Sequence, residues 1–189
     1  MISREQALEL LKSMPQKESD MNHYLETEAI MKKLAEKLGE NAEYWSMLGL
    51  LHDVDWALTR DNWEEHCSKA EQILKDKGFD DTFIQIIQAH AYGYEEISRF
   101  KDKKRTNKVE QCLAASETLT GLIYAYALMR KSIEGMEVKG LKKKFKDKTF
   151  AANCNRDIIR EIEPYLPLNE FFELAIKAMQ EIKEQIGLG

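Results

Sequence analysis

The feature that most constrains the fold of this chain is residues 44–51, where nearly every side chain is apolar. A helix that is apolar on every side belongs inside a protein, so we expect a central helix over residues 41–55. His52 and Asp53 follow directly after the apolar run. Burying an imidazole and a carboxylate on apolar ground is costly unless a partner satisfies them. A divalent metal ion would satisfy both, and the sequence therefore predicts an internal metal site.

Apolar residues recur at helical spacing along most of the remaining chain. Glycine and proline number only 9 and 3 in 189 residues, and Glu, Lys, Leu and Ala, which favour helix, are abundant. Ser3 and Gln6 form a capping-box pattern that begins an N-terminal helix, and Asp80 and Asp81 cap another that ends near His90. Further helices are expected over residues 22–38, 63–77, 108–130, 155–163 and 171–186. These patterns predict an all-α fold, a single-domain helical bundle.

Net charge and cysteine usage limit the expected partners and compartment. The formal net charge is −5, so nothing in it favours nucleic acid or an anionic membrane as a partner. Cys67, Cys112 and Cys154 are far apart, which indicates reduced thiols in a cytoplasmic protein, and Cys67 is expected to be inert packing. The N-terminus lacks the apolar region of a signal peptide. The longest apolar run, residues 121–129, is too short to span a membrane.

Two segments are rich in basic residues. Residues 99–108 hold six basic residues against one acid, and residues 131–148 hold seven lysines against three acids. We expect both to be solvated loops. Both are short, and aromatic residues are not interleaved with the basic ones, so nucleic acid is not an expected partner.

The chain has four histidines, and each lies at or near an end of a predicted apolar-faced helix, outside the basic loops. They are His23, His52, His66 and His90. Glu117 lies among small side chains of the helix expected over residues 108–130, and small side chains let neighbouring helices approach closely. Because these helices are expected around the one that carries Asp53, the sequence predicts that imidazoles and carboxylates from separate segments meet around a cation.

The order His, His-Asp, His, His, Glu along the chain resembles the HD-domain superfamily, which is named after the dipeptide. The resemblance is carried by residues 51–56, 65–66, 88–90, 119–123 and 142–152, which look like those of small predicted HD hydrolases. It extends from about residue 5 to about residue 180. It implies one HD domain over residues 1–189, with metal-binding core helices over about 22–130 and a C-terminal helical extension over about 131–189.

Carried over residue by residue, the resemblance implies a ligand set for one metal ion that consists of His23, His52, Asp53 and Glu117. Asp53 would bridge to a second ion held by His66 and His90, as in the dinuclear members. The last ligand is usually Asp, whereas Glu117 is one methylene longer, which would shift the site or weaken its first ion.

Some HD nucleotidases also carry an acid one turn after the dipeptide, where this chain has Trp56. The nearest spare acid is Asp55. We expect Asp55 to act as a catalytic acid or base or, alternatively, to orient a ligating histidine.

Imidazole and carboxylate ligands suit Mn²⁺, Fe²⁺, Co²⁺, Ni²⁺ or Zn²⁺, bound as one ion or two. Two such ions would activate a water molecule and clamp the oxygens of an in-line phosphoryl displacement. The predicted function is therefore a metal-dependent phosphohydrolase acting on a small phosphorylated substrate: a phosphomonoester, a nucleotide or a phosphodiester. Positive charge is needed at the phosphate oxygens. The candidates to supply it are Lys142, Lys143, Lys144, Lys146 and Arg156.

Two other functions fit the same pattern. The ligand order is similar to that of HD-type mixed-valence diiron oxygenases such as myo-inositol oxygenase, which iron with a mixed-valence paramagnetic signal would favour. The departure at Glu117 also fits a non-catalytic HD module that binds a metal or another ligand. The amphipathic helix expected over residues 171–186 could serve a homodimer interface.

Overall fold

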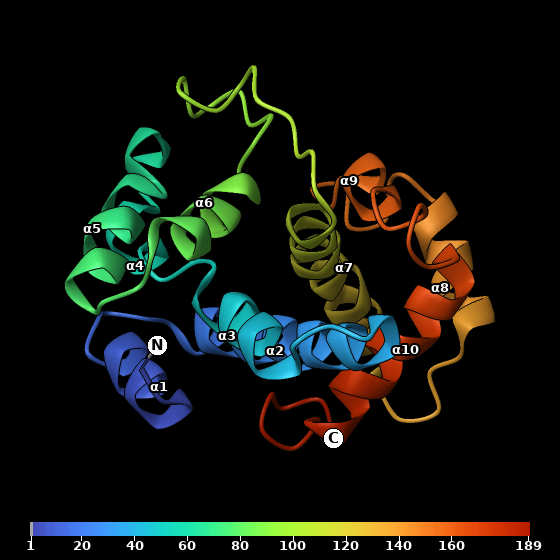
Figure 1. The fold of residues 1–189 in the computed structure, drawn as a ribbon. Helices are drawn as coiled ribbons and strands as arrows, with labels where there is room; N and C mark the ends of the chain where they lie inside the picture. The colour runs from blue at the N-terminus through green and yellow to red at the C-terminus, as the bar shows by residue number, and fades with distance from the viewer. Residues whose placement is uncertain (1) are drawn as a thin grey trace.

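The structure, a computed structural model, describes residues 2–189, and these residues form helices and loops with no β-strand. The all-α prediction is confirmed. Figure 1 shows α4, α5 and α6 gathered on one side of the long helix α7, and α8, α9 and α10 on the other. The elements in chain order are α1 (Arg4–Lys12), α2 (Glu18–Leu38), α3 (Ala42–Leu51), α4 (Trp56–Thr59), the 3₁₀ turn η1 (Trp63–Glu65), α5 (Ser68–Asp76), α6 (Asp81–Ala89), α7 (Lys108–Arg130), α8 (Val138–Lys146), α9 (Arg156–Arg160) and α10 (Leu168–Glu181).

Helix α3 is the central helix that the apolar run predicts. Its residues from Met47 to Leu51 are all buried, and α2, α6 and α7 pack against it. The helix ends four residues earlier than expected, at Leu51, and residues 52–55 continue as turns. His52, whose backbone angles are still helical, thus caps the end of α3, and Asp53 lies in the turn that follows.

Helix α7 has the bounds expected from the sequence, residues 108–130. Asn107 and Glu110 form a capping box at its start, in which each side chain accepts a hydrogen bond from the other residue's backbone N–H. By length and composition alone this helix could cross a membrane, but 61% of the apolar window is buried inside the protein. A long apolar helix of this kind is typical of a protein core.

Gly49 allows α2 and α3 to approach closely. A Cβ atom at this position would lie 2.7 Å from the carbonyl oxygen of Thr27 and 2.9 Å from the backbone nitrogen of Glu28. Both are backbone atoms, which cannot move aside as the end of a flexible side chain can. The absence of a side chain at Gly49 thus sets the spacing of the two helices that carry His23 and His52.

Substitution Gly49→Ala is expected to lower the free energy of unfolding by about 3 kcal/mol, because the methyl group forces α3 away from α2. Denaturant unfolding measures the loss. The control is Glu43→Ala on the exposed side of α3, which should change stability by less than about 0.5 kcal/mol. Equal stabilities of the Gly49→Ala variant and the wild type would contradict the close approach.

The helix expected over residues 63–77 is interrupted. The turn η1 ends at Glu65 and α5 begins at Ser68, so His66 lies between them and not in the first turn of a helix. Cys67 adopts a left-handed backbone conformation, with φ of 63°. This sharp reversal of the chain aims His66 inward, and helical periodicity alone does not predict it.

The two basic segments are not simply solvated loops. Within residues 131–148, Val138–Lys146 form α8, because Leu141 and Phe145 share one face and bury it. In the other segment, the side chain of Arg105 is only 7% exposed. Arg105 donates hydrogen bonds to three carbonyl groups at the end of α6, those of Ala89, His90 and Tyr92.

Arg105 also forms a two-pronged ion pair with Glu161. The last carbonyl groups of a helix have no partner within it, so Arg105 caps α6 and ties its end to the residues that follow α9. The residue held most directly by this clamp is His90.

Candidate metal centre

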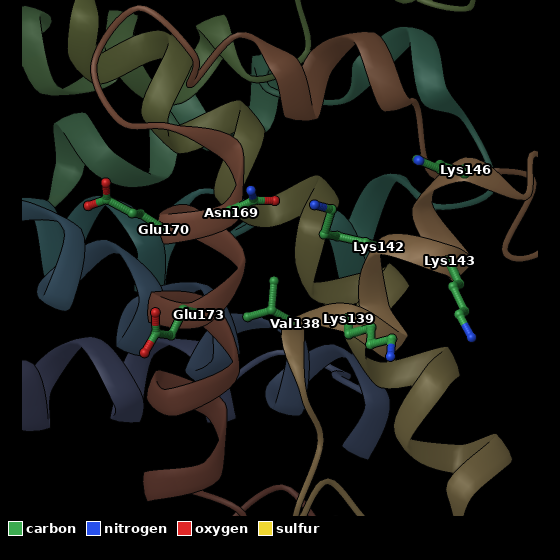
Figure 2. Close-up of a pocket in the computed structure, with 8 residues that line it drawn as sticks. All are labelled: Val138, Lys139, Lys142, Lys143, Lys146, Asn169, Glu170 and Glu173. Carbon is green, nitrogen blue, oxygen red and sulfur yellow. The ribbon is translucent and has the colours of Figure 1, made fainter.

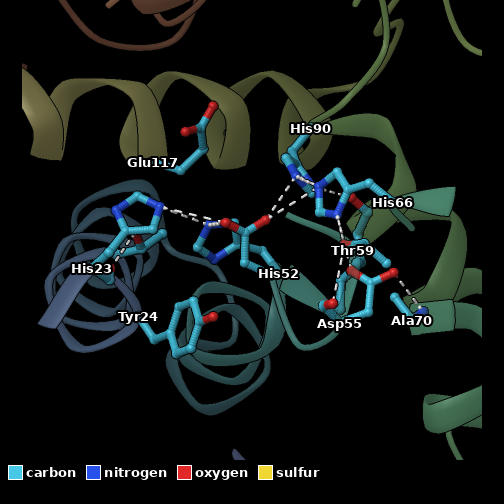
Figure 3. Close-up of polar contacts among 12 residues, drawn as sticks. His23, Tyr24, His52, Asp55, Thr59, His66, Ala70, His90 and Glu117 are labelled. Carbon is cyan, nitrogen blue, oxygen red and sulfur yellow. Dashed lines mark hydrogen bonds and ion pairs between the residues drawn. The ribbon is translucent and has the colours of Figure 1, made fainter. Parts of the chain in front are cut away.

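Four imidazoles converge on the carboxylate of Asp53. Figure 3 labels the four histidines, which come together from separate segments of the chain. His23 comes from α2, His52 from the end of α3, His66 from the turn after η1 and His90 from the end of α6. The Nε2 atoms of His66 and His90 lie 3.4 and 3.1 Å from Asp53 Oδ1. Those of His52 and His23 lie 3.7 and 3.9 Å from Asp53 Oδ2. Segments far apart in the sequence thus meet at one point.

The histidines form two pairs, one at each oxygen of Asp53. Nε2 of His23 lies 3.0 Å from Nε2 of His52, and Nε2 of His66 lies 3.2 Å from Nε2 of His90. Such separations suit two ligand nitrogens on one transition-metal ion, each about 2 Å from the metal. The arrangement therefore presents two candidate ion positions that share the carboxylate of Asp53.

The other ring nitrogen of each histidine has an acceptor. For His52 and His90 this acceptor is the backbone carbonyl three residues back in the helix. The distances are 2.8 Å from His52 Nδ1 to the Gly49 oxygen and 2.6 Å from His90 Nδ1 to the Ile87 oxygen. A carbonyl oxygen only accepts, so Nδ1 of each ring carries an N–H and donates it, which leaves Nε2 as the nitrogen able to bind a metal. The helix ends thereby set the tautomer that a metal requires.

The two remaining rings are oriented by side chains. His66 Nδ1 lies 3.0 Å from Oδ1 of Asp55. His23 Nδ1 lies 2.9 Å from the hydroxyl of Thr120, and that hydroxyl donates to the Glu117 carbonyl, so it accepts from His23. Hydrogen bonds of this kind fix the ring orientation and tautomer of metal-ligating histidines. All four Nε2 atoms therefore face Asp53.

The pKa shifts in the cluster indicate that a positive charge would be stabilised there. Burial lowers the pKa of His52 to about 3 and lowers the pKa of His23 below its usual value, so both are neutral at neutral pH. Although burial raises the pKa of Asp53, the histidines around it outweigh burial and hold that pKa well below its usual value. Imidazole nitrogens and a carboxylate converge at short range, and such a set of ligand atoms fits a divalent cation.

The pKa of His66 also indicates that a positive charge is stabilised here, although it shifts in the opposite direction from those of His23 and His52. Burial lowers its pKa, but the neighbouring Cys67, Asp53 and Asp55 outweigh burial and raise it. A proton on His66 is one way to supply the missing positive charge, and a metal ion is another.

Asp55 does not face the cavity. It is completely buried, with Oδ1 facing His66 and Oδ2 accepting the backbone N–H of Ala70 at 2.9 Å. Both oxygens are engaged on the far side of His66, and a role as catalytic acid or base stays a prediction. The geometry agrees with the alternative, in which Asp55 orients a histidine.

Glu117 lies beside the cluster and is not as close to it as the histidines. Figure 3 shows it on α7, and both Glu117 and His23 line one cavity. Its carboxyl group accepts a hydrogen bond from Thr118 at 2.6 Å, and burial raises its pKa to about 7. The close group of candidate ligands at this end of the site consists of His23, His52 and Asp53. Coordination by Glu117 stays a prediction, since it requires the carboxylate to turn from Thr118.

Cys67 is a neighbour of the site that the sequence does not single out as functional. One potential ligand atom from each of His66, Cys67 and His90 lies within 4.8 Å of the others, and Cys67 is completely buried. Only the left-handed turn at Cys67 places its side chain here, and no spacing rule in the sequence indicates it.

A cavity of about 600 Å³ adjoins the cluster. Its walls come from α2, η1, the loop between α6 and α7, α7 itself and the segment before α9. The lining residues are His23, Trp63, Tyr94, Glu96, Glu117, Thr118, Gly121, Asn153, Cys154 and Asn155. Because His23 and Glu117 are among them, the cavity is the natural place for a substrate of the candidate centre.

The predicted phosphate-binding residues do not line this cavity. Lys142, Lys143 and Lys146 line a separate groove between α8 and α10 (Figure 2), which shares no residue with the cavity. Lys144 lies over the ring of Phe150, with its Nζ 4.5 Å from the ring centroid.

Arg156, the fifth predicted phosphate contact, points its guanidinium at backbone carbonyls, including those of Ala151 and Phe150. It therefore holds together the segment before α9. The structure does not bring these five basic side chains to the histidine cluster, because the buried face of α8 turns its lysines toward α10 and solvent.

Comparison with known proteins identifies the class. The HD domain family matches residues 21–121, which is more than half of the chain and includes all six predicted ligands. The chain therefore belongs to the HD-domain family, which indicates a metal-dependent phosphohydrolase superfamily and a site for divalent metal.

Two of the curated relatives are named Ribonuclease Y. The protein from Mesoplasma florum is 25% identical over 146 residues, which are 75% of this chain and 27% of that protein. The protein from Helicobacter acinonychis is 32% identical over 77 residues, which are 41% of this chain and 14% of that protein. The chain thus spans about a quarter or less of the length of these relatives. No solved structure matches.

Proposed function

We propose that this chain is a phosphohydrolase that uses two divalent metal ions bound at the histidine cluster. The observation that carries the proposal is the position of Asp53, whose two carboxylate oxygens each face one histidine pair. This places four Nε2 atoms and both oxygens of one carboxylate where two ions could share them.

His23 and His52 would hold one ion and His66 and His90 the other, with Asp53 shared between them. Imidazole nitrogens and carboxylate oxygens suit Mn²⁺, Fe²⁺, Co²⁺, Ni²⁺ or Zn²⁺. When bound, such ions would lower the pKa of a coordinated water toward ~7 and offset the negative charge of the phosphoryl oxygens. This would supply the positive charge that no lysine or arginine brings to the cavity.

The remaining residues act by holding the ligands in place. Asp55 and Thr120 hold the rings of His66 and His23 so that their Nε2 atoms would reach a bound ion. Arg105 fixes the end of α6 behind His90. Ligands held by such bonds do not have to reorganise during the reaction, which is the advantage of a preorganised site.

The test is reconstitution. Protein stripped of metal with a chelator and reloaded with Mn²⁺, Co²⁺, Ni²⁺, Fe²⁺ or Zn²⁺ is expected to hydrolyse phosphomonoesters only when loaded. Elemental analysis is expected to find two ions per chain. A loaded protein with two bound ions that cleaves no member of a broad phosphoester panel would disprove the proposal. A mixed-valence iron signal in a protein that cleaves no phosphoester would favour the oxygenase alternative.

A further inference from the structure

The cavity beside the candidate metal centre has an aromatic wall. Trp63 from η1 and Tyr94 from the loop between α6 and α7 line it, with ring centroids 6.5 Å apart. Trp56 packs edge-on against Trp63, with ring centroids 5.2 Å apart. Trp63 is nevertheless 40% exposed, although a large aromatic side chain gains free energy when it is covered. A flat ring bound against this wall would cover it by stacking.

The two segments that form this wall are tied together. Ser98 donates hydrogen bonds from its backbone N–H, at 3.0 Å, and from its hydroxyl to the carboxylate of Glu64, the residue after Trp63. Behind the wall, Ile97 and Phe100 form a small apolar cluster against which Tyr94 packs. The wall is therefore formed before any ligand binds, and little conformational entropy is lost when one does.

The same cavity has no basic side chain among its lining residues. The ionisable groups that line it, within the part of the chain the structure describes, include two carboxyl groups, those of Glu96 and Glu117, and one imidazole, that of His23. The arginines nearest in sequence to Glu96 are engaged elsewhere. Arg99 lies 4.3 Å from the ring of Phe100 and donates to the His66 carbonyl, and Arg105 caps α6.

A substrate carrying a second phosphate would therefore place it against Glu96 with no protein cation to offset the charge. Glu96 is exposed, so water screens part of this repulsion, but two like charges in close contact still repel. A repulsive element of this kind selects against a wrong substrate as effectively as an attractive contact selects the right one.

We propose that Trp63 and Glu96 determine substrate specificity: the site takes a phosphomonoester of a flat aromatic group that carries no further negative charge. This rests on the proposed phosphohydrolase function. One phosphate is placed at the ion positions, the ring stacks on Trp63, and Glu96 disfavours any additional phosphate. Mononucleotides and aryl phosphates fit these conditions. Nucleoside diphosphates and oligoribonucleotides do not, even though the curated relatives are ribonucleases by name.

The first test compares kcat/KM of the Mn²⁺-loaded protein for adenosine monophosphate, glycerol phosphate, adenosine diphosphate and a short oligoribonucleotide. Adenosine monophosphate is expected to exceed each of the others by about tenfold or more. Trp63→Leu should lower the ratio of adenosine monophosphate to glycerol phosphate by about tenfold, because stacking is lost. Trp63→Phe keeps an aromatic face and should retain most of the ratio. It also serves as the second variant should Trp63→Leu fold poorly.

The second test addresses charge. Glu96→Lys should raise the ratio of kcat/KM for adenosine diphosphate to that for adenosine monophosphate by about tenfold. Glu95→Lys is the matched control, because Glu95 is exposed like Glu96 but does not line the cavity, and it should leave the ratio unchanged. The proposal is overturned if the wild-type protein cleaves the diphosphate or the oligoribonucleotide as well as the monophosphate, or if both lysine variants behave alike.

A binding measurement separates this proposal from the proposed function. Adenosine, which has no phosphate to cleave, is expected to quench the tryptophan fluorescence of the metal-loaded protein saturably, and Trp63→Phe should abolish the quenching. Quenching without cleavage of any phosphoester would overturn the phosphohydrolase function and leave the aromatic site standing. Cleavage without quenching and without preference for the aromatic ester would overturn the specificity proposal alone.

Discussion

Replacement of Asp53 by asparagine is expected to lower phosphohydrolase activity by on the order of 1,000-fold and to lower the bound metal from two ions to one or none. The carboxylate faces both histidine pairs, at 3.1 and 3.4 Å through Oδ1 and at 3.7 and 3.9 Å through Oδ2. Asparagine is nearly the same size but lacks the negative charge, and its amide nitrogen cannot coordinate a cation. Elemental analysis and kcat measured at saturating metal check both parts.

The pairing of the histidines also predicts how many ions each histidine variant should lose. His23→Gln and His66→Gln each remove one member of a different pair, so each should lose one ion and keep the other. The control is Asp61→Asn, an exposed residue, which should retain both ions and full activity. Two tightly bound ions in the Asp53→Asn protein would show that this carboxylate is not shared between them.

The second large effect concerns Glu26, a buried carboxyl group on α2 outside the site. Only 2% of Glu26 is exposed, its Oε1 has no hydrogen-bond partner, and burial raises its pKa from 4.5 to about 8. Because the folded pKa lies above the unfolded one, the stability linked to this group is fully present below pH 4.5 and is lost as the pH rises through 8. The total loss corresponds to about 5 kcal/mol, as an upper estimate.

Glu26→Gln removes the titration while keeping the size of the side chain. The variant is therefore expected to be more stable than the wild type above pH 8, with a difference that shrinks toward zero as the pH falls to 4.5. Denaturant unfolding of both proteins across this range gives the difference in their free energies of unfolding at each pH. Groups that titrate in the same way in both proteins do not contribute to this difference. Glu36→Gln, on an exposed face of the same helix, should show no such curve. A flat difference curve for Glu26→Gln would mean that Glu26 is ionised in the folded protein.

Sequence reasoning predicted those helices best whose ends are set by local hydrogen bonds. The capping box of Asn107 and Glu110 lies at the start of α7, and both predicted ends of that helix agree with the structure. The capping box of Ser3 and Gln6 likewise begins α1. Caps are contacts between residues three apart, so they depend on little besides the local sequence.

Sequence reasoning failed where a residue's environment depends on distant partners. Arg105 belongs to a segment expected to be solvated, yet it is buried because the carbonyls of α6 and the carboxylate of Glu161 surround it. The lysines of α8 were expected at a phosphate. They line another groove, because Leu141 and Phe145 dock the opposite face of the helix on the core.

The sequence by itself determined which residue types are available and on which helices they lie: four histidines, each near a helix end, and an Asp53 that follows a helix too apolar to lie anywhere but inside. Only the tertiary structure decided that one carboxylate lies between two imidazole pairs, that Asp55 turns away to hold His66, and that the adjoining cavity is aromatic and free of basic side chains. The reason is that helix periodicity and capping act over a few residues. The meeting of the four segments that carry the histidines depends on how whole helices pack, and this in turn depends on close approaches such as that at Gly49.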